Sequence, residues 1–400
     1  MNRIVVVGAS AGGLAMAEAL RRVRYEGAIT LVGDEPHAPY DRPPLSKQLL
    51  KGDWQPERLA LRPAADIQAL GLDLRLGATA IGLDRNSRQV HLADGGRVPY
   101  DALIVATGVR PRRLPGCEGV SGVHVLRTVE DALALKEALR PDRRLVIVGG
   151  GFIGAEVAAT ARALGVTVTL LEAGTVPMGL AIGEEAGRFL TRIHLAHGVD
   201  VRTDTSVHEI QSSADGRVTG VLLSDGSVLA ADGVLVAVGS LPNTEWLAGS
   251  GLLLQDGLLC DEYSAAAPDV YGVGDVARWH NPLFGTPMRI EHRTNAAEQA
   301  LAVARNLLTP DQRRPFAPVP YFWSDQYDVK IHAYGHLRGH DEALVLKSEE
   351  AQRLLVAYRR GERLTGVLAA GLPPRTVRAW RSLVAAGTPW TEAVIGASVA

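Results

Sequence analysis

The chain has 400 residues, 46% of them hydrophobic and 22% charged, and this composition excludes a disordered chain. At roughly 100 to 200 residues per domain, the length predicts two or three domains. The 42 basic and 44 acidic residues leave a net charge of −2, so we expect no nucleic acid and no anionic membrane as a partner. The two cysteines are far apart and belong to no Cys/His cluster, so we expect no metal site.

An apolar run at residues 4–17 follows Arg3, as in a secretory signal peptide. Glycines interrupt this run, and the segment after it has the pattern of an amphipathic helix. Both features favour a strand followed by a helix over a signal peptide. No run in the sequence reaches the roughly 18 apolar residues that a membrane-spanning helix needs. We therefore expect a cytoplasmic protein.

The sequence repeats one pattern, an apolar strand followed by a glycine-rich loop, at residues 4–13 and 145–154. In each copy a helical pattern follows, and then a second apolar strand, at 28–33 and 166–171. Such βαβ units build parallel, doubly wound sheets. The sequence therefore predicts an α/β fold with two dinucleotide-binding, Rossmann-like domains.

Further strands are expected after each unit, and the pattern changes towards the C-terminus. Alternating residues around the turns at 94–96 and 225–226 predict antiparallel insertions in both halves. After a proline-rich stretch at 310–320, alternation predicts an antiparallel sheet and then a helix from Pro374. We expect a discontinuous first domain at 1–110 and 240–320, a second domain at 111–239, and a small α+β C-terminal domain at 321–400.

The second glycine loop fits the dinucleotide-binding pattern G-x-G-x-x-G, between a strand and a helix. Gly149 permits the tight turn, Gly151 lets a pyrophosphate approach the backbone, and Gly154 lets helix and strand pack closely. Glu172 ends the next strand, near the spacing from which a carboxylate accepts hydrogen bonds from the ribose hydroxyls of NAD. Because Glu172 would repel a 2′-phosphate, we expect NADH rather than NADPH.

The first loop has the sequence GASAGG, which keeps Gly8 and Gly13 but has Ser10 in place of the second glycine. Serine is small enough to let a pyrophosphate lie close to the backbone. Asp34 or Glu35, after the next strand, is placed to bind the ribose. A second nucleotide site is therefore predicted at this loop.

Three further motifs accompany the two loops: strand ends at Gly108 and Gly239, and the sequence YGVGD that ends at Asp275. With PYDRPPLSK at 39–47 and FWSDQY at 322–327, they resemble the oxygenase-coupled ferredoxin reductases over nearly the whole chain. The resemblance implies a glutathione-reductase-like fold, FAD and NADH as cofactors, and a 2Fe-2S ferredoxin that feeds a terminal oxygenase. It implies FAD contacts at Gly12, Asp34, Arg42, Lys47, Ala80, Arg127, Asp275 and Arg293.

The resemblance also implies which residues act at the flavin. It places Lys47 beside the reactive nitrogen of the flavin, Glu156 beside the nicotinamide, and Trp323 at the flavin edge that faces the ferredoxin. A buried Lys–Glu pair keeps both groups charged at lower cost than either group alone. The alternatives are, respectively, a solvated lysine, a carboxylate in the first turn of a helix, and a core tryptophan.

The cysteines separate this family from its relatives. Enzymes that resemble glutathione reductase need a redox-active cysteine pair, and NADH oxidases or peroxidases of similar fold need a single cysteine near Leu45 and Ser46. Neither is present. We therefore expect electrons to leave the flavin directly, one at a time, as a ferredoxin accepts them. Rubredoxin or monodehydroascorbate as acceptor, or an NADH-responsive flavin sensor resembling apoptosis-inducing factor, are the alternatives.

Overall fold

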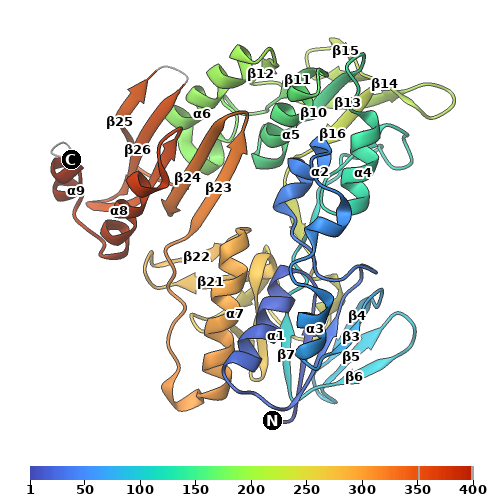
Figure 1. Cartoon of the computed structure of the whole chain (residues 1–400), viewed down its shortest axis with the longest axis vertical. Helices are drawn as coiled ribbons and strands as arrows, with labels where there is room; N and C mark the ends of the chain where they lie inside the picture. The colour runs from blue at the N-terminus through green and yellow to red at the C-terminus, as the bar shows by residue number, and fades with distance from the viewer. Residues whose placement is uncertain (350–351, 398–400) are drawn as a thin grey trace. The chain divides into compact units, whose positions relative to one another are not determined.

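The computed structural model describes residues 1–349 and 352–397, and the chain divides into two compact units. The first unit consists of Met1–Asp41, Glu57–Arg110 and Leu241–Pro320. The second consists of Arg42–Pro56, Pro111–Ser240 and Tyr321–Ala400. Each unit contains one copy of the glycine-loop repeat, and Figure 1 labels many of the elements of both. Two short strands, β8 (Val109–Pro111) and β17 (Ser240–Pro242), lie at the boundaries in sequence.

The first unit is built on a six-stranded sheet with the strand order β19-β20-β7-β1-β2-β3. All neighbouring strands run parallel except β19, which is antiparallel to β20. The strand order reverses at β1, with β2 and β3 on one side and β7 and β20 on the other, which gives the predicted Rossmann-like order with an antiparallel strand at one edge. Its strands are β1 (Arg3–Val7), β2 (Ala28–Val32), β3 (Asp73–Arg75), β7 (Ala102–Val105), β19 (Ala265–Ala267) and β20 (Val270–Gly272).

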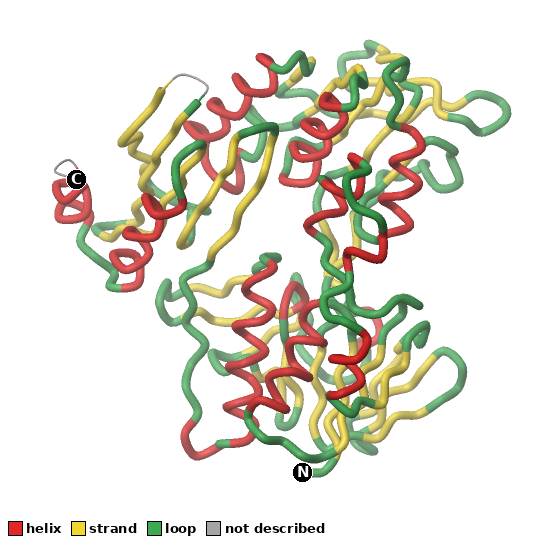
Figure 2. Tube along the Cα trace, in the orientation of Figure 1, coloured by secondary structure: helices red, strands yellow, loops and turns green. Residues whose placement is uncertain are grey.

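Different layers cover the two faces of this sheet. Helices α1 (Ala11–Arg22) and α7 (Arg293–Leu308) lie side by side on one face (Figures 1 and 2). On the other face, apolar side chains of two small sheets complete the core. One of these sheets consists of β4 (Ala80–Asp84), β5 (Gln89–Leu92) and β6 (Arg97–Pro99). The other consists of β18 (Leu258–Cys260), β21 (Ala277–Asn281) and β22 (Thr286–Arg289). The shorter elements are η2 (Pro56–Leu59), α3 (Ala64–Ala69), η3 (Glu245–Leu247), η4 (Gly274–Val276) and η5 (Pro310–Gln312).

The second unit repeats this plan with a five-stranded parallel sheet in the order β12-β11-β10-β16-β9. Three antiparallel strands pack on one face and complete a buried apolar core. The sheet strands are β9 (Val123–His124), β10 (Arg144–Val148), β11 (Thr167–Leu171), β12 (Asp200–Arg202) and β16 (Gly233–Val236). The covering strands are β13 (Val207–Ser212), β14 (Val218–Leu223) and β15 (Val228–Ala230), and the helices are α4 (Val129–Ala138), α5 (Phe152–Ala163) and α6 (Gly179–Ala196).

A five-stranded antiparallel sheet forms the C-terminal part of the second unit, in the order β23-β24-β27-β26-β25. Its apolar side chains pack against α6, and helix α8 contacts β24 and β27. Helix α8 begins at Pro374, as the sequence predicts. The elements are β23 (Tyr321–Gln326), β24 (Val329–Gly335), β25 (Glu342–Glu349), β26 (Arg353–Arg360), β27 (Arg363–Ala370), α8 (Pro374–Ala385) and α9 (Trp390–Ala397).

The segment Arg42–Pro56 belongs to the second unit, although it lies within the stretch 1–110 that the sequence assigns to the first domain. It contains η1 (Pro43–Ser46) and α2 (Gln48–Lys51), and these short helices contact α4 and α5. Packing, rather than position along the chain, therefore decides the unit to which this segment belongs.

The two glycine loops are packed in the same way. A Cβ on Gly13 would lie 1.8 Å from the carbonyl oxygen of Gly8, and a Cβ on Gly154 would lie 2.0 Å from that of Gly149. Only glycine allows the helix to approach the preceding strand so closely at these positions. The repeat that the sequence predicts is therefore also present in the structure of the two loops.

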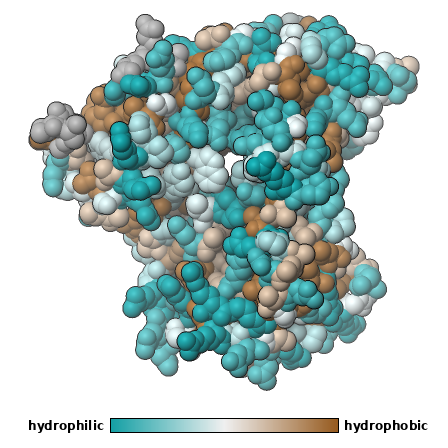
Figure 3. Space-filling model, in the orientation of Figure 1, coloured by the Kyte–Doolittle hydropathy of each residue, from teal (hydrophilic) through white to brown (hydrophobic). Residues whose placement is uncertain are grey.

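Within the described part of the chain, no helix is both long and apolar enough to cross a membrane. The face shown in Figure 3 carries separate apolar patches among hydrophilic residues.

His194 is a buried titratable group on α6, with no exposed surface. Its Nδ1 lies 2.9 Å from the hydroxyl of Tyr327, whose ring stacks on His197 at a centroid distance of 3.7 Å. Burial lowers the pKa of His194 from 6.5 to about 4, and the neighbouring His197 acts in the same direction. His194 is therefore neutral in the folded protein at pH 7.

We predict that this histidine makes the protein less stable in acid. Between about pH 6.5 and pH 4 the unfolded chain binds a proton at His194 that the folded chain does not, so stability is lost as the pH falls. His194→Gln should remove up to about 3 kcal/mol of this pH dependence. Melting temperatures at pH 7 and pH 4.5 test it, with the exposed His208→Gln as control. Equal pH dependence in wild type and His194→Gln would contradict the prediction.

Candidate functional site

The second glycine loop leaves space where a dinucleotide would bind. Gly149 has a positive φ of 104°, and a Cβ there would lie 2.4 Å from the carbonyl oxygen of Ala237. Gly151 is the N-cap of α5, and no side chain caps this helix end. Apart from its chain neighbours, no atom of the described residues lies within 4 Å of the position of its missing Cβ. The first N–H groups of α5 and the open position at Gly151 together fit a pyrophosphate.

Glu172 is fixed beside this loop by two backbone donors. Its Oε2 accepts from the N–H of Gly150 at 2.9 Å, and its Oε1 accepts from the N–H of Gly174 at 2.8 Å. The carboxylate is therefore held next to the pyrophosphate position, at the end of β11, where a ribose would lie. This arrangement suits an adenosine ribose with free hydroxyls and disfavours one with a 2′-phosphate.

The first glycine loop is open in the same way despite its serine. Ser10 is the N-cap of α1, its backbone is extended, and its hydroxyl does not cap the helix. A Cβ on Gly12 would make only ordinary contacts, 3.6 Å from the nearest atom, so packing does not require glycine there. Asp34 follows β2 and is exposed, while the Glu35 carboxylate accepts from the hydroxyl of Tyr40. The loop therefore fits a second pyrophosphate.

The other candidates of the first unit lie at the ends of elements. Ala80 begins β4, and Asp275 lies in η4, which follows the buried strand β20. Arg293 begins α7, and its Nε donates to Asp41 Oδ1 at 2.7 Å. The guanidinium of Arg293 thus forms an ion pair with Asp41 within the protein.

The other candidates of the second unit include two arginines that lie together. Arg42 donates through Nη1 to the carbonyl oxygen of Arg127 at 2.6 Å. The N–H of Arg127 in turn donates to Asp131, whose side chain also takes part in the capping box of α4. Gly239 has a φ of 98° and open space around its missing Cβ. The structure thus brings Arg42 and Arg127 together, while Gly12, Asp34, Ala80, Asp275 and Arg293 belong to the first unit.

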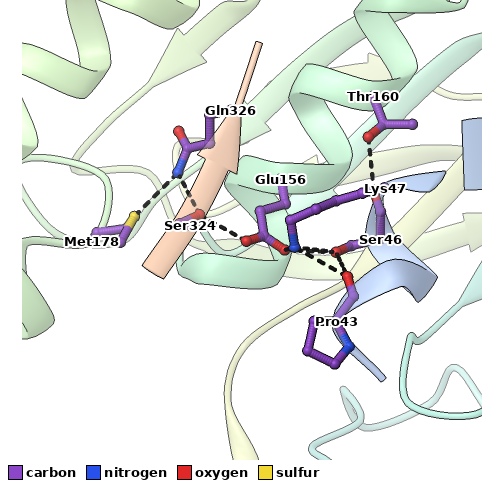
Figure 4. A network of polar contacts seen from close by, with 8 residues as sticks. All are labelled: Pro43, Ser46, Lys47, Glu156, Thr160, Met178, Ser324 and Gln326. Carbon is purple, nitrogen blue, oxygen red and sulfur yellow. Dashed lines mark hydrogen bonds and ion pairs between the residues drawn. The ribbon is translucent and has the colours of Figure 1, made fainter. Parts of the chain in front are cut away.

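Lys47 and Glu156 form a buried ion pair (Figure 4). Lys47 Nζ lies 2.6 Å from Glu156 Oε2, and the two side chains are 13% and 7% exposed. The ammonium also donates to the carbonyl of Pro43 at 3.1 Å and to Ser46 Oγ at 3.3 Å. Lys47 is therefore not a solvated lysine, and because the first turn of α5 contains no acidic residue, Glu156 is not a first-turn carboxylate.

Two serines complete the surroundings of Glu156. Ser46 Oγ donates to Oε2 at 2.6 Å, and Ser324 Oγ donates to Oε1 at 2.7 Å. Ser46 is held in turn through its carbonyl oxygen, which accepts from Thr160 Oγ1 at 2.8 Å. In Figure 4, Glu156 lies between Ser324 on one side and Ser46 with Lys47 on the other. Three separate segments, η1, α5 and β23, thus meet at one carboxylate.

Trp323 lies on the opposite face of β23 from Ser324. Burial alternates along this strand, with Ser324 and Gln326 buried and Trp323 partly exposed. The Trp323 ring stacks on Tyr321 at 6.0 Å, and Tyr321 contacts Tyr334 at 4.7 Å between centroids. Trp323 is therefore part of an aromatic surface rather than of the core.

Neither cysteine can take part in a thiol relay. Cys117 and Cys260 are both buried and in no disulfide, and burial raises the pKa of Cys260 to about 12. Within residues 1–349 and 352–397, no group of three or more His, Cys, Asp or Glu side chains is arranged to hold a metal ion.

The sequence did not point to Ser46, Ser324 or Gln326 as site residues. A signal for two of them was present, since alternation along FWSDQY places Ser324 and Gln326 together on one face of the strand, opposite Trp323. Two polar residues on the buried face need a polar partner. The identity of that partner, Glu156, depends on how β23 packs against α5.

Comparison with known proteins gives two family matches. The model of the pyridine nucleotide-disulphide oxidoreductases matches residues 2–300, and the model of the reductase C-terminal domain matches residues 321–398. The first match covers both glycine loops, and the second begins at β23.

Individual relatives match along nearly the whole chain. Rhodocoxin reductase of Rhodococcus erythropolis is 38% identical over 391 residues, which cover 97% of this chain and 90% of that protein. The ferredoxin–NAD(+) reductase component of the p-cumate 2,3-dioxygenase system of Pseudomonas putida is 38% identical over 337 residues, covering 84% and 81%. The crystal structure of the covalent putidaredoxin reductase–putidaredoxin complex matches with a TM-score of 0.93 and 35% identity, covering 100% of this chain and 99% of that one.

We predict that Glu172→Arg reverses the nucleotide preference. The change removes the acceptor for the ribose hydroxyls and supplies a cation for a 2′-phosphate, so kcat/KM should fall at least about tenfold for NADH and rise for NADPH. Steady-state kinetics with both nucleotides measures the ratio. The matched control is Glu209→Arg, at an exposed carboxylate on β13. An unchanged ratio in Glu172→Arg would show that Glu172 does not contact the ribose.

Proposed function

The chain belongs to the pyridine nucleotide-disulphide oxidoreductase family, and we propose that it is an NADH-dependent ferredoxin reductase of an oxygenase system. One observation carries this proposal: the buried Lys47–Glu156 pair lies in a chain that matches such reductases end to end and has no reactive thiol. Because the chain has no thiol relay, its electrons must pass directly from the flavin to the acceptor.

The two glycine loops are assigned to FAD in the first unit and to NADH in the second. FAD, when bound, supplies the redox chemistry, because it accepts a hydride from NADH and releases electrons singly. Gly8, Gly13 and the open N-terminus of α1 would hold its pyrophosphate, with Asp34 at the ribose. Gly149, Gly151 and Gly154, together with Glu172, would hold NADH.

Lys47 and Glu156 place two opposite charges at fixed positions. The Lys47 ammonium donates to three acceptors, which fix its position, and one of them is the carboxylate of Glu156, its ion-pair partner. A fixed positive charge stabilises negative charge that develops nearby during reduction. We assign this role to Lys47 and the orientation of the nicotinamide to Glu156.

The aromatic surface at Trp323 is assigned to the acceptor side. Trp323 stacks on Tyr321, which contacts Tyr334, on the face of β23 and β24 that points away from Glu156. A partly exposed aromatic cluster of this kind is typical of a protein contact. We propose a 2Fe-2S ferredoxin as the protein that binds there and carries electrons to the oxygenase.

The function is tested by the dependence of electron transfer on ferredoxin. The purified protein should be yellow, its flavin should bleach with NADH in the absence of oxygen, and it should reduce cytochrome c rapidly only when a 2Fe-2S ferredoxin is added. An equal rate without ferredoxin would refute the proposal. Rubredoxin and monodehydroascorbate, assayed in parallel, identify a different acceptor. Slow turnover with every acceptor, together with NADH-dependent dimerisation, would indicate a redox sensor.

We predict that Lys47→Met slows reduction of the flavin by NADH at least about tenfold, because it removes the fixed charge at the site. Anaerobic stopped-flow absorbance measures the rate. Lys51→Met is the matched control, since Lys51 is exposed and forms an ion pair with the exposed Asp53. Flavin content and melting temperature show whether Lys47→Met still folds and binds FAD. An unchanged rate in a folded, FAD-loaded variant would remove Lys47 from the mechanism.

A further inference from the structure

Glu156 depends on the C-terminal sheet for one of its hydrogen bonds. Ser324, which donates to Glu156 Oε1 at 2.7 Å, lies on β23, in the segment that the reductase C-terminal model matches. Glu156 lies on α5, in the nucleotide-binding part of the same unit. A carboxylate assigned to the nicotinamide is thus held partly by a domain whose expected role concerns the electron acceptor.

The hydrogen bonds at the carboxylate show what Ser324 controls. A carboxylate has about four acceptor positions, two on each oxygen. Lys47 and Ser46 occupy both positions on Oε2, and Ser324 occupies one on Oε1. Among the described residues the other position on Oε1 has no donor, so it can accept one from a bound nucleotide. Ser324 therefore sets the direction in which this position points.

Ser324 is itself held in one orientation. Its Oγ accepts from Gln326 Nε2 at 3.3 Å, so its own hydrogen is directed at Glu156. Gln326 is anchored by a second contact, from Nε2 to Met178 Sδ at 3.6 Å. Ser324 and Gln326 have no exposed surface, so water does not compete for these groups. Figure 4 shows this row from Met178 through Gln326 and Ser324 to Glu156.

We propose that Ser324 is a positioning residue of the NADH site, which orients Glu156 from the C-terminal sheet. The proposal rests on the proposed function, because it takes Glu156 as the nicotinamide contact. It extends that function by giving β23 two roles. The buried face of the strand holds the carboxylate on the NADH side, and its other face presents Trp323 to the acceptor.

Ser324→Ala tests the proposal by removing one hydroxyl from a buried position with little change in volume. We expect binding of NAD⁺ to the FAD-loaded protein, measured by calorimetry, to weaken on the order of tenfold, the effect of losing a hydrogen bond to a charged group. Anaerobic reduction by NADH should slow as well. Ser324→Thr keeps the hydroxyl and should recover most of the affinity. Unchanged NAD⁺ affinity in Ser324→Ala would overturn the proposal.

A double-mutant cycle with Glu156→Gln shows whether Ser324 acts through Glu156. If it does, Ser324→Ala should have little further effect on NAD⁺ affinity in the Glu156→Gln background, whereas additive effects would overturn the proposal. Thr365→Val is the matched control, since it removes a hydroxyl bonded to the carbonyl of Tyr358 in the same sheet, away from Glu156. An equal loss of NAD⁺ affinity in Thr365→Val would show that Ser324 only stabilises the sheet, and it would overturn the positioning role.

These measurements separate the proposal from the assigned function. NAD⁺ binding and flavin reduction involve no ferredoxin, so they test Ser324 whichever acceptor the protein uses. If ferredoxin proves irrelevant but Ser324→Ala weakens NAD⁺ binding, the acceptor assignment fails and the positioning role stands. If ferredoxin is required but Ser324→Ala binds NAD⁺ normally, only the positioning role fails.

Discussion

The buried ion pair between Lys47 and Glu156 is the interaction on which the site depends. A buried charge is costly unless it is paired and hydrogen-bonded, and removal of one partner leaves the other uncompensated. Here the pair draws donors and acceptors from three segments that are distant in sequence, at Pro43–Ser46, α5 and β23. The pair also joins the segment Arg42–Pro56 to α5, within the unit with which this segment packs.

The two glycine loops use the same packing of helix against strand at the two proposed nucleotide sites. In both, the third glycine allows the helix to touch the carbonyl of the first, which opens the helix end towards a phosphate. The loops differ at the middle position, where Ser10 stands in the first and Gly151 in the second. Ser10 leaves the end of α1 uncapped, so the substitution keeps the helix N–H groups available to a ligand.

Strand β23 links the surroundings of Glu156, on one of its faces, to the aromatic surface at Trp323, on the other. Its period of two places Ser324 and Gln326 on the buried face and Tyr321 and Trp323 on the other. On the buried face Ser324 donates a hydrogen bond to Glu156. On the other face Trp323 stacks on Tyr321, which contacts Tyr334. A strand is suited to this because neighbouring side chains point in opposite directions while the backbone between them stays rigid within the sheet.

The sequence by itself determined the two βαβ units, the three glycine positions of the second loop, the acidic residue after β11 and the C-terminal sheet with its helix from Pro374. These features follow from local periodicity and spacing, which can be recognised within one segment of the sequence. Lys47 and Glu156 were paired beforehand only through the family resemblance. The tertiary structure alone decided that Ser46 and Ser324 complete their surroundings, that Arg42 meets Arg127, and that Arg293 pairs with Asp41. A pattern of burial records which face of an element is covered, but only the packing of the whole chain determines which distant element covers it.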